Sequence, residues 1–299
     1  MSRSIGMHNL PRSFISTLQN HVGQEVKIRG WIHRIRELAK TTFVLVKDCT
    51  GIVQCVGSTD TLRSSRLREE DAIEIHGSVR EETRAQRGFE LDILGLNVLN
   101  PAKEMLPFHS ASDLSSVSPE ILLDHRPLAL RNERIGDIFR IQAAILRYFR
   151  EFLTANQFTE IISSKIVGGG TEGGTNLFAI RYFERVAYLA QSPQFYKEHG
   201  VAGFERVFET GHVYRAEPHA TSRHLTEYYS MDLEIGFIDG PEDVIQLERE
   251  LLSFIFAKLN NENASLLARF RSDPLPSMLQ VPIWDFGDCI RRLRDKFGR

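Results

Sequence analysis

The sequence predicts an α+β protein in which a small β-barrel is followed by a sheet flanked by helices. Five short stretches of alternating apolar and polar residues fall within the first hundred positions. After a segment rich in proline and serine, apolar residues recur at spacings of three and four, which is typical of amphipathic helices, among short strand-like runs. Because these strands and helices do not alternate regularly, a parallel doubly wound sheet is not expected.

The barrel prediction depends on strands with one buried and one exposed face. The five runs are residues 25–33, 42–47, 51–56, 71–79 and 89–98. A turn signal at residues 48–51 (DCTG) separates the second run from the third. Five short strands can close either an OB-fold or an SH3-like barrel, and the periodicity alone does not separate the two.

Residues 101–120 are predicted to be a linker, because they hold three prolines and five serines with little periodicity. The expected organisation is therefore a barrel domain at 1–100, a linker at 101–120 and a second domain at 121–299. In the second domain, helices are expected from Ile138 to Phe152 and over 241–259. The expected strands are 186–189, 206–209, 212–215 and 230–237.

Composition excludes several classes of protein. The chain of 299 residues has 37 Lys and Arg against 39 Asp and Glu, and its three cysteines are too few and scattered for a disulfide framework or a zinc site. No apolar run approaches the roughly 18–20 residues of a membrane span, and the amino terminus lacks the apolar core of a signal peptide. These features predict a cytoplasmic protein. The near-neutral charge disfavours a general polyanion binder but leaves room for a local basic groove that reads RNA.

The first of three polar clusters is the glycine-rich segment 168–174 (GGGTEGG). It lacks the spacing of a phosphate-binding P-loop. Such a segment is either a plain surface loop or a loop that closes over a small ligand, in which case Glu172 could pair with an ammonium group.

The second cluster, residues 191–197 (QSPQFYK), follows an apolar strand. Gln194 and Lys197 are three residues apart and share one face of a helical turn. The ammonium group of Lys197 could bind a carboxylate there. The alternative is an ordinary solvated helix start.

The third cluster contains Arg215 and Glu217, predicted on one strand face, and then Arg223, His224 and Tyr228 in a loop and returning strand. An arginine fork suits phosphate oxygens, a carboxylate can accept from an adenine amino group, and an aromatic ring can stack on the base. An Arg-x-Glu pair alone is usually a surface ion pair that contributes little to stability. Chance explains the whole string less well than it explains that pair.

These three clusters, in this order, resemble class II aminoacyl-tRNA synthetases, and specifically the aspartyl/asparaginyl subgroup with an amino-terminal OB-fold that binds the anticodon. The resemblance runs from about residue 23 to the end of the chain, and is greatest to the archaeal-type aspartyl enzymes. It implies an OB-fold barrel followed by an incomplete class II antiparallel sheet flanked by helices.

The resemblance also implies roles for the residues of the clusters. Arg215 would hold the α-phosphate of ATP as the catalytic arginine, and Glu217 would read the adenine. Arg223 and His224 would contact the outer phosphates, and Tyr228 would stack on the base.

The same resemblance places four residues around the amino acid. They are Glu172, Gln194, Lys197 and Asp232. Aspartyl enzymes have the lysine that corresponds to Lys197, whereas asparaginyl enzymes usually have a different segment. A buried ammonium also favours a carboxylate over a neutral amide, so aspartate is the expected substrate.

In the barrel, Phe43, Gln54 and Glu90 match positions with which the family reads the anticodon. OB barrels commonly read single-stranded loops with an aromatic platform and hydrogen bonds to base edges. For Phe43 considered alone, the alternative is a core phenylalanine.

The sequence departs from the family pattern at several points. Ser164 stands where motif 1 ends in a proline that lies at the family's dimer interface, and His212 replaces another proline. A Gly-x-Gly-x-Gly run ending in arginine, the family's motif 3, does not occur in the chain. The ligands for Mg²⁺ are expected in that same region, so no metal-binding residue is assigned here.

The expectation is therefore an aspartate–tRNA ligase truncated before motif 3, which uses ATP and Mg²⁺ and has tRNA-Asp, and in non-discriminating relatives also tRNA-Asn, as its partner. Homodimers are typical of the family. The alternatives are an inactive tRNA-binding paralogue, an asparaginyl-tRNA synthetase, and a paralogue that makes asparagine from aspartate.

Overall fold

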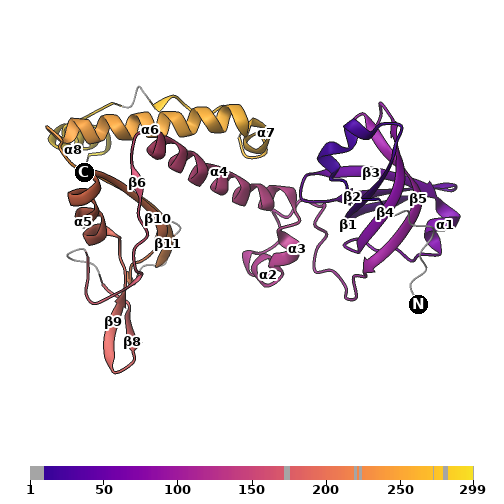
Figure 1. Ribbon diagram of the computed structural model, residues 1–299, viewed down its shortest axis with the longest axis horizontal. Helices are drawn as coiled ribbons and strands as arrows, with labels where there is room; N and C mark the ends of the chain where they lie inside the picture. The colour runs from indigo at the N-terminus through magenta and orange to yellow at the C-terminus, as the bar shows by residue number, and fades with distance from the viewer. Residues whose placement is uncertain are drawn as a thin grey trace. The chain divides into compact units, whose positions relative to one another are not determined.

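The chain forms two compact units that follow one another in the sequence, Met1–Gly136 and Asp137–Arg299 (Figure 1). The computed structural model describes residues 10–171, 176–218, 221, 224–271, 273–278 and 282–298. Within these ranges, none of the helices combines the length and apolar character that crossing a membrane requires.

The first unit contains the predicted five-stranded barrel. Its strands are β1 (Glu25–Glu37), β2 (Thr41–Lys47), β3 (Ile52–Ser58), β4 (Ala72–Glu81) and β5 (Phe89–Asn100). They close in the order β1-β2-β3-β5-β4, with β3 and β5 parallel and the other pairs antiparallel. All five expected strands are confirmed, with ends that differ from the expected ones by up to four residues.

Alternation along the strands produces the barrel core. Val44 and Val46 of β2 point inward and are fully buried, as are Ile73 and Ile75 of β4. Gly30 directly precedes the first β1–β2 pair, Trp31 with Lys47, and a Cβ atom on Gly30 would come within 2.4 Å of the Lys47 carbonyl oxygen. A larger residue at that position would force the two strands apart.

A buried carboxylate at the β2–β3 turn connects this turn to a short helix. The helix, η1 (Ile15–His21), is a 3-10 helix. Oδ2 of Asp48 accepts from the Ile15 amide at 2.9 Å, and Oδ1 accepts from the Thr50 and Gly51 amides at 2.7 and 3.0 Å. The predicted turn at 48–51 is thus confirmed, and Asp48 also fixes the segment that leads into the barrel.

The segment that follows the barrel contains no helix or strand from residue 101 to residue 118. It is nevertheless packed, because Phe108 and Leu114 are buried in a small cluster with Ala129. Besides η1, three short helices of this unit were not predicted: α1 (Thr59–Arg63), α2 (Pro119–Asp124) and α3 (Arg126–Ala129).

The second unit begins within a long helix, α4 (Glu133–Ala155), and holds two small sheets. The strands are β6 (Thr159–Glu160), β7 (Ile166–Val167), β8 (Ala179–Tyr182), β9 (Arg185–Leu189), β10 (Arg206–Tyr214) and β11 (Glu227–Ile235). The helices that follow α4 are α5 (Gln194–Phe204), α6 (Pro241–Glu262), α7 (Ala264–Leu267) and α8 (Phe286–Phe297). The expected helices at 138–152 and 241–259 are confirmed as parts of α4 and α6.

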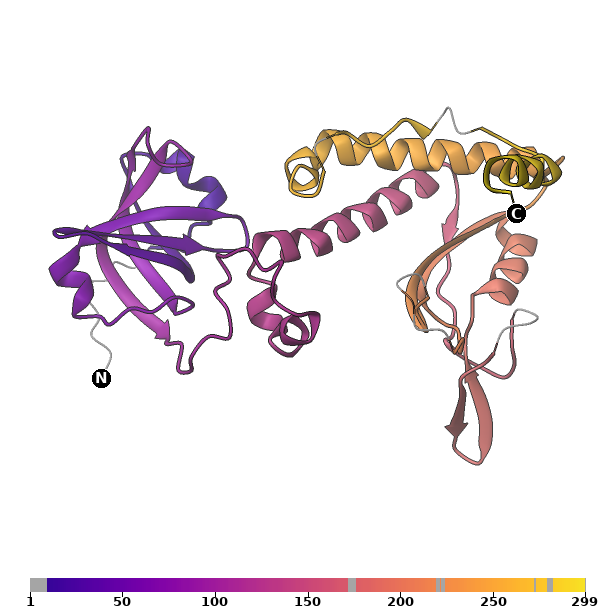
Figure 2. The same ribbon diagram turned by 180° about the vertical axis from the view of Figure 1, so that it is seen from behind.

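One sheet has the order β11-β10-β6 and the other β7-β9-β8. β10 and β11 pair in antiparallel register, but β6 pairs with β10 in parallel, so the first sheet is mixed rather than wholly antiparallel. The two strands expected at 206–209 and 212–215 are one strand, because Thr210 and Gly211 keep the register with Met231 and Ser230. Figure 2 shows β8 and β9 as a hairpin.

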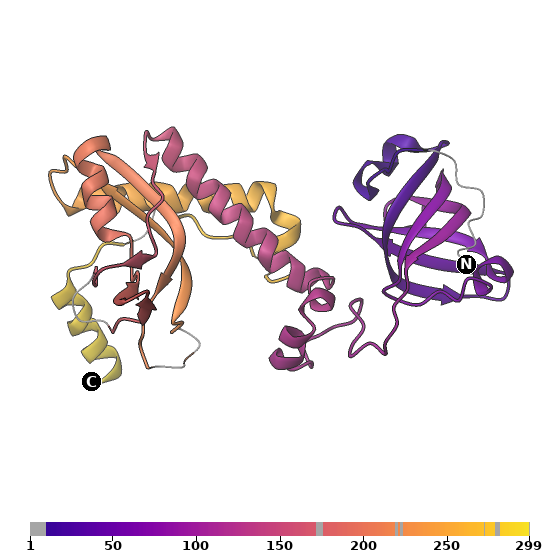
Figure 3. The same cartoon turned by 60° about the horizontal axis from the view of Figure 1, so that its bottom comes forward.

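Helices cover both faces of the β10–β11 pair (Figures 1 and 3). Phe208 belongs to an apolar cluster with residues of α4 and α6. Val207 points the opposite way, toward α5, where a Cβ atom on Gly200 would lie 3.1 Å from the valine side chain. Glu209, Gly211 and Val213 lie on the same face as Val207, because side chains alternate along a strand.

We predict that Asp48→Ala lowers the free energy of unfolding of the barrel by about 3 kcal/mol, because the buried Ile15 amide and two amides of the turn lose a charged acceptor. Urea unfolding followed by circular dichroism would measure the loss. Asp60→Ala, at an exposed position of α1, is the control and should leave the midpoint almost unchanged. Equal effects of the two substitutions would contradict the structural role of Asp48.

Candidate functional site

The outer face of the barrel carries the predicted anticodon-reading residues. On β2, Phe43 and Leu45 alternate with the buried Thr42, Val44 and Val46 and are themselves half-buried. Phe43 therefore lies outside the barrel core, which answers the alternative raised by its sequence context. Gln54 is half-buried on the neighbouring strand β3.

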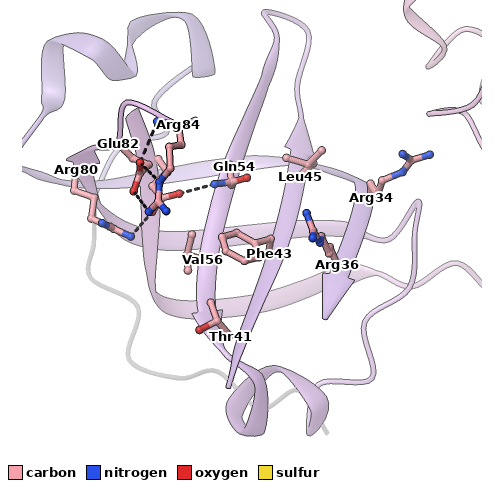
Figure 4. A pocket seen from close by; sticks show the side chains of 11 residues that line it. Arg34, Arg36, Thr41, Phe43, Leu45, Gln54, Val56, Arg80, Glu82 and Arg84 are labelled. Carbon is pink, nitrogen blue, oxygen red and sulfur yellow. Dashed lines mark hydrogen bonds and ion pairs between the residues drawn. The ribbon is translucent and has the colours of Figure 1, made fainter. Parts of the chain in front are cut away.

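Strand register brings basic and apolar side chains together on this face. Arg34 of β1 lies opposite Leu45, and Leu45 lies opposite Gln54. In the adjacent row, Arg36 lies opposite Phe43. Figure 4 shows Phe43 and Gln54 between arginines on either side.

A groove of about 700 Å³ opens over this face. We call it the barrel groove, and its lining residues are Arg34, Arg36, Thr41, Phe43, Leu45, Gln54, Val56, Arg80, Glu82, Arg84 and Glu90. An aromatic ring among arginines suits a stacked base with its phosphates nearby. The groove contains all three residues predicted from the sequence, whereas its four arginines were missed. The i, i+2 spacing of Arg34 and Arg36 was the available signal.

Glu90 lies at the base of the groove and is only 2% exposed. Oε2 accepts a hydrogen bond from Nε2 of Gln54 at 2.6 Å, and Oε1 pairs with the guanidinium of Arg80. Arg80 also donates from Nε to Oδ1 of Asp92 at 2.9 Å. Gln54, Glu90 and Arg80 thus form a continuous polar chain across β3, β5 and β4.

The turn between β4 and β5 adds a second acid–base pair to the groove. Arg84 donates to both carboxylate oxygens of Glu82, at 2.9 and 3.0 Å. These side-chain hydrogen bonds, together with one from the Arg84 amide, lower the pKa of Glu82 to about 2. The Arg84 side chain is 88% exposed, so solvent access to its charge remains.

In the second unit, Lys197 is buried between the first turn of α5 and β11. Its Nζ atom lies 3.2 Å from Oε2 of Glu234, 3.7 Å from Oδ1 of Asp232 and 3.4 Å from the Leu233 carbonyl oxygen. The lysine side chain is 7% exposed, and the two carboxylates are 21% and 31% exposed. The distances from Nζ are longer than the roughly 2.7–2.9 Å of a charge-assisted hydrogen bond, so the three N–H donors of the ammonium group are not saturated and can donate to a ligand carboxylate.

Gln194 lies one turn before Lys197, as the spacing predicted, because both belong to the first turn of α5. The Gln194 side chain is half-buried and donates from Nε2 to Oε1 of Glu198 at 2.9 Å. The Ser192 hydroxyl accepts from the Gln194 amide at 3.2 Å and so fixes the start of the helix.

Arg215 and Glu217 were expected on a strand face, but β10 ends at Tyr214 and both residues follow it without regular structure. Pairing continues for one residue, because the Arg215 amide donates to the Thr226 carbonyl oxygen at 2.9 Å. The Arg215 guanidinium carbon lies 5.7 Å from the centroid of the Tyr228 ring. The structure therefore brings these two predicted residues together at the end of the β10–β11 pair.

The remaining predicted residues are only partly described. Nδ1 of His224 and the Thr221 hydroxyl form a hydrogen bond of 2.7 Å. Glu172 and Arg223 lie outside the described residues.

A buried ion pair lies on the α5-facing side of β10 and was not predicted from the sequence. Glu209 is 4% exposed, and Oε1 lies 2.6 Å from Nζ of Lys165. It also accepts from the Ser163 amide at 3.2 Å. The pair connects the segment before β7 to β10, and no local sequence signal joins residues so distant along the chain.

The side chains in the described ranges include no group of three or more His, Cys, Asp or Glu residues suited to a metal ion.

Comparison with known proteins identifies the family. Residues 118–295 match the family model of class II tRNA synthetases (D, K and N). The chain belongs to this family. Residues 26–99 match the model of the OB-fold nucleic acid-binding domain, so the barrel is an OB-fold rather than an SH3-like barrel.

Relatives of this class II synthetase chain cover most of its length. It is 44% identical over 250 residues to aspartate–tRNA(Asp/Asn) ligase of Deinococcus radiodurans. The alignment covers 84% of this chain and 57% of that protein. It is 39% identical over 288 residues to the ligase of the same name from Thermus thermophilus, covering 96% and 67%. The chain thus spans 57% and 67% of the length of these two relatives.

A solved structure supports the same fold. Asparaginyl-tRNA synthetase of Pyrococcus horikoshii, complexed with asparaginyl-adenylate, superimposes with a TM-score of 0.88 at 28% identity. The match covers 96% of this chain and 68% of that one. The predicted resemblance and fold class are confirmed, and the roles of the individual site residues stay predictions.

Proposed function

We propose that this chain carries the anticodon-binding and substrate-binding portions of an aspartate–tRNA ligase. The observation that carries the proposal is the buried Lys197 ammonium at the start of α5, beside Asp232 and Glu234. The names of the relatives support aspartate as the amino acid, at 36–44% identity.

In this proposal, Lys197 pairs with the side-chain carboxylate of aspartate. Asp232, Gln194 and Glu172 line the remainder of the amino-acid pocket, where a carboxylate can accept from the substrate ammonium. Asparagine carries no charge on its side chain, so its amide oxygen would be a weaker, neutral partner for the buried ammonium.

ATP would bind near the end of the β10–β11 pair. Arg215 contacts the α-phosphate, Glu217 accepts from the adenine amino group, and Tyr228 stacks on the base. Arg223 and His224 contact the outer phosphates. This arrangement is supported by the closeness of the Arg215 guanidinium to the Tyr228 ring.

The chemistry is mainly positioning and charge stabilisation. The α-carboxylate of aspartate attacks the α-phosphorus in line, the bond to the β-phosphate oxygen breaks, and pyrophosphate leaves. Arg215 offsets the charge that develops on the α-phosphate oxygens. A terminal ribose hydroxyl of the tRNA then attacks the activated carbonyl carbon, and AMP leaves as the ester forms.

The barrel groove would bind the anticodon loop of tRNA-Asp, with a base stacked on Phe43 and its edge read by Gln54 and Glu90. The relatives named for tRNA(Asp/Asn) support tRNA-Asn as a second acceptor. Asparaginyl-tRNA synthetase is the second candidate function, and the superposition on the Pyrococcus horikoshii enzyme favours it.

We predict that the chain binds a stable sulfamoyl analogue of aspartyl-adenylate at least about tenfold more tightly than the asparaginyl analogue. Lys197→Met should weaken the aspartyl analogue by about 100-fold, because a desolvated charge pair is lost, and change the asparaginyl analogue little. Isothermal titration calorimetry would measure both affinities, with circular dichroism to verify the fold of the variant.

Lys296→Met, at an exposed position of α8, is the matched control and should leave both affinities unchanged. Tighter binding of the asparaginyl analogue would instead assign the chain to the asparaginyl enzymes. Failure to bind either analogue would reject the proposal for the second unit.

For the barrel, we predict that Phe43→Ala weakens binding of a tRNA-Asp anticodon hairpin by about 10- to 100-fold, since base–aromatic stacking contributes roughly 1–3 kcal/mol. Fluorescence anisotropy of a labelled hairpin would measure the change. Phe14→Ala removes a phenylalanine that is 41% exposed outside the groove and should change binding little. Similar losses for both variants would argue against stacking on Phe43.

A further inference from the structure

A polar chain of three side chains ends at Arg80 on one side of the barrel groove. Arg80 and Glu90 are directly opposite each other on β4 and β5, and Gln54 reaches Glu90 from β3. Glu90 is 2% exposed, so it needs compensating partners that do not come from water. Arg80 supplies the positive charge, and Gln54 supplies the second hydrogen bond.

The pairing between Glu90 and Arg80 determines how the Gln54 amide must point. A carboxylate that pairs with a guanidinium accepts hydrogen bonds and donates none. Gln54 therefore turns its NH₂ group toward Glu90, at 2.6 Å from Oε2. Its carbonyl oxygen is left as the group available to a ligand in the groove, which Gln54 lines (Figure 4).

We infer that Arg80 is a positioning residue for base recognition, which acts through Glu90 to keep the Gln54 side chain in its acceptor orientation. The inference rests on the proposed binding of tRNA by this groove. It assigns to Gln54 a preference for a pyrimidine whose ring N3 carries a hydrogen.

The preference has a simple chemical form for the pyrimidines. Uracil has an N3–H donor at the position where cytosine has a bare N3 acceptor. Codons for aspartate and asparagine share adenine at their second position, so both tRNAs carry uridine at the centre of the anticodon. An acceptor held by Arg80 and Glu90 would therefore favour the uridine that the two tRNAs have in common.

The alternative role for Arg80 is a direct contact with a phosphate. The N–H donors of Arg80 are already engaged in close ion pairs with two carboxylates, Glu90 and Asp92. By contrast, Arg34 and Arg36 on the opposite side of the groove have no ion pair among the residues that the structure describes. Phosphate contacts are therefore better served by Arg34 and Arg36, which leaves Arg80 to the positioning of Glu90.

The inference is tested with two anticodon hairpins that differ only in a uridine or cytidine at the central position. The ratio of their dissociation constants is measured by fluorescence anisotropy. We expect the unaltered chain to prefer uridine at least about tenfold and Arg80→Gln to lose most of that preference. Arg80→Lys should retain it, since an ammonium group still pairs with Glu90.

A double-mutant cycle distinguishes positioning from other effects. Glu90→Gln should also reduce the uridine preference, because a neutral amide can donate to Gln54 as well as accept from it. Adding Arg80→Gln to Glu90→Gln should cause no further loss of preference. The double variant contains no buried charge at position 90, so it provides a test even if Arg80→Gln alone fails to fold.

Equal weakening of both hairpins by Arg80→Gln, with the ratio preserved, would overturn the inference and leave a phosphate contact as the role of Arg80. A further loss of preference in the double variant would also overturn it. Arg63→Gln, which breaks an exposed ion pair with Glu37 outside the groove, is the matched control and is expected to keep the uridine-to-cytidine ratio. Absence of hairpin binding by the unaltered chain would reject the proposed function of the barrel together with this inference.

Discussion

Buried charges paired with opposite charges from neighbouring elements are the constraint on which both candidate sites depend. Glu90 is enclosed in the barrel beside Arg80, and Glu209 is enclosed in the second unit beside Lys165. At Lys197 the roles are reversed, and a buried ammonium faces Asp232 and Glu234. A buried charge without a partner is costly, so each pairing fixes the side chains around it before a ligand arrives.

The two sites share one arrangement, in which a buried charge pair lies beside the group that faces the ligand. In the barrel groove, the charge pair lies beneath an aromatic platform and orients an amide that faces the groove. In the second unit, the ammonium group lies beside half-open acids, which suits a small zwitterion with an additional carboxylate. Both sites are built across paired strands or at a helix start, so the backbone hydrogen bonds of these elements keep the positions of the reading groups fixed.

The sequence predicted the barrel well, because half-buried strands repeat with a period of two and every run carried that pattern. The prediction failed where strand pairing, rather than the local sequence, determines the structure. β10 continues through Gly211 because its partner strand keeps the register, whereas glycine normally weakens a strand. β6 and β7 have two residues each and are too short for any periodicity. The link from Arg80 to Glu90 depends on the register of β4 and β5, which no local pattern reveals.

The order of the barrel groove before RNA binds is tested most directly by the exchange rate of the Gln54 side-chain amide protons. Nuclear magnetic resonance would measure this rate in the RNA-free chain. Because Gln54 donates to the buried Glu90, its amide protons should exchange at least about tenfold more slowly than those of the exposed Gln86. Loss of the slow signal in Gln54→Ala would assign it. Equal rates for Gln54 and Gln86 would contradict the claim that the groove is ordered before RNA binds.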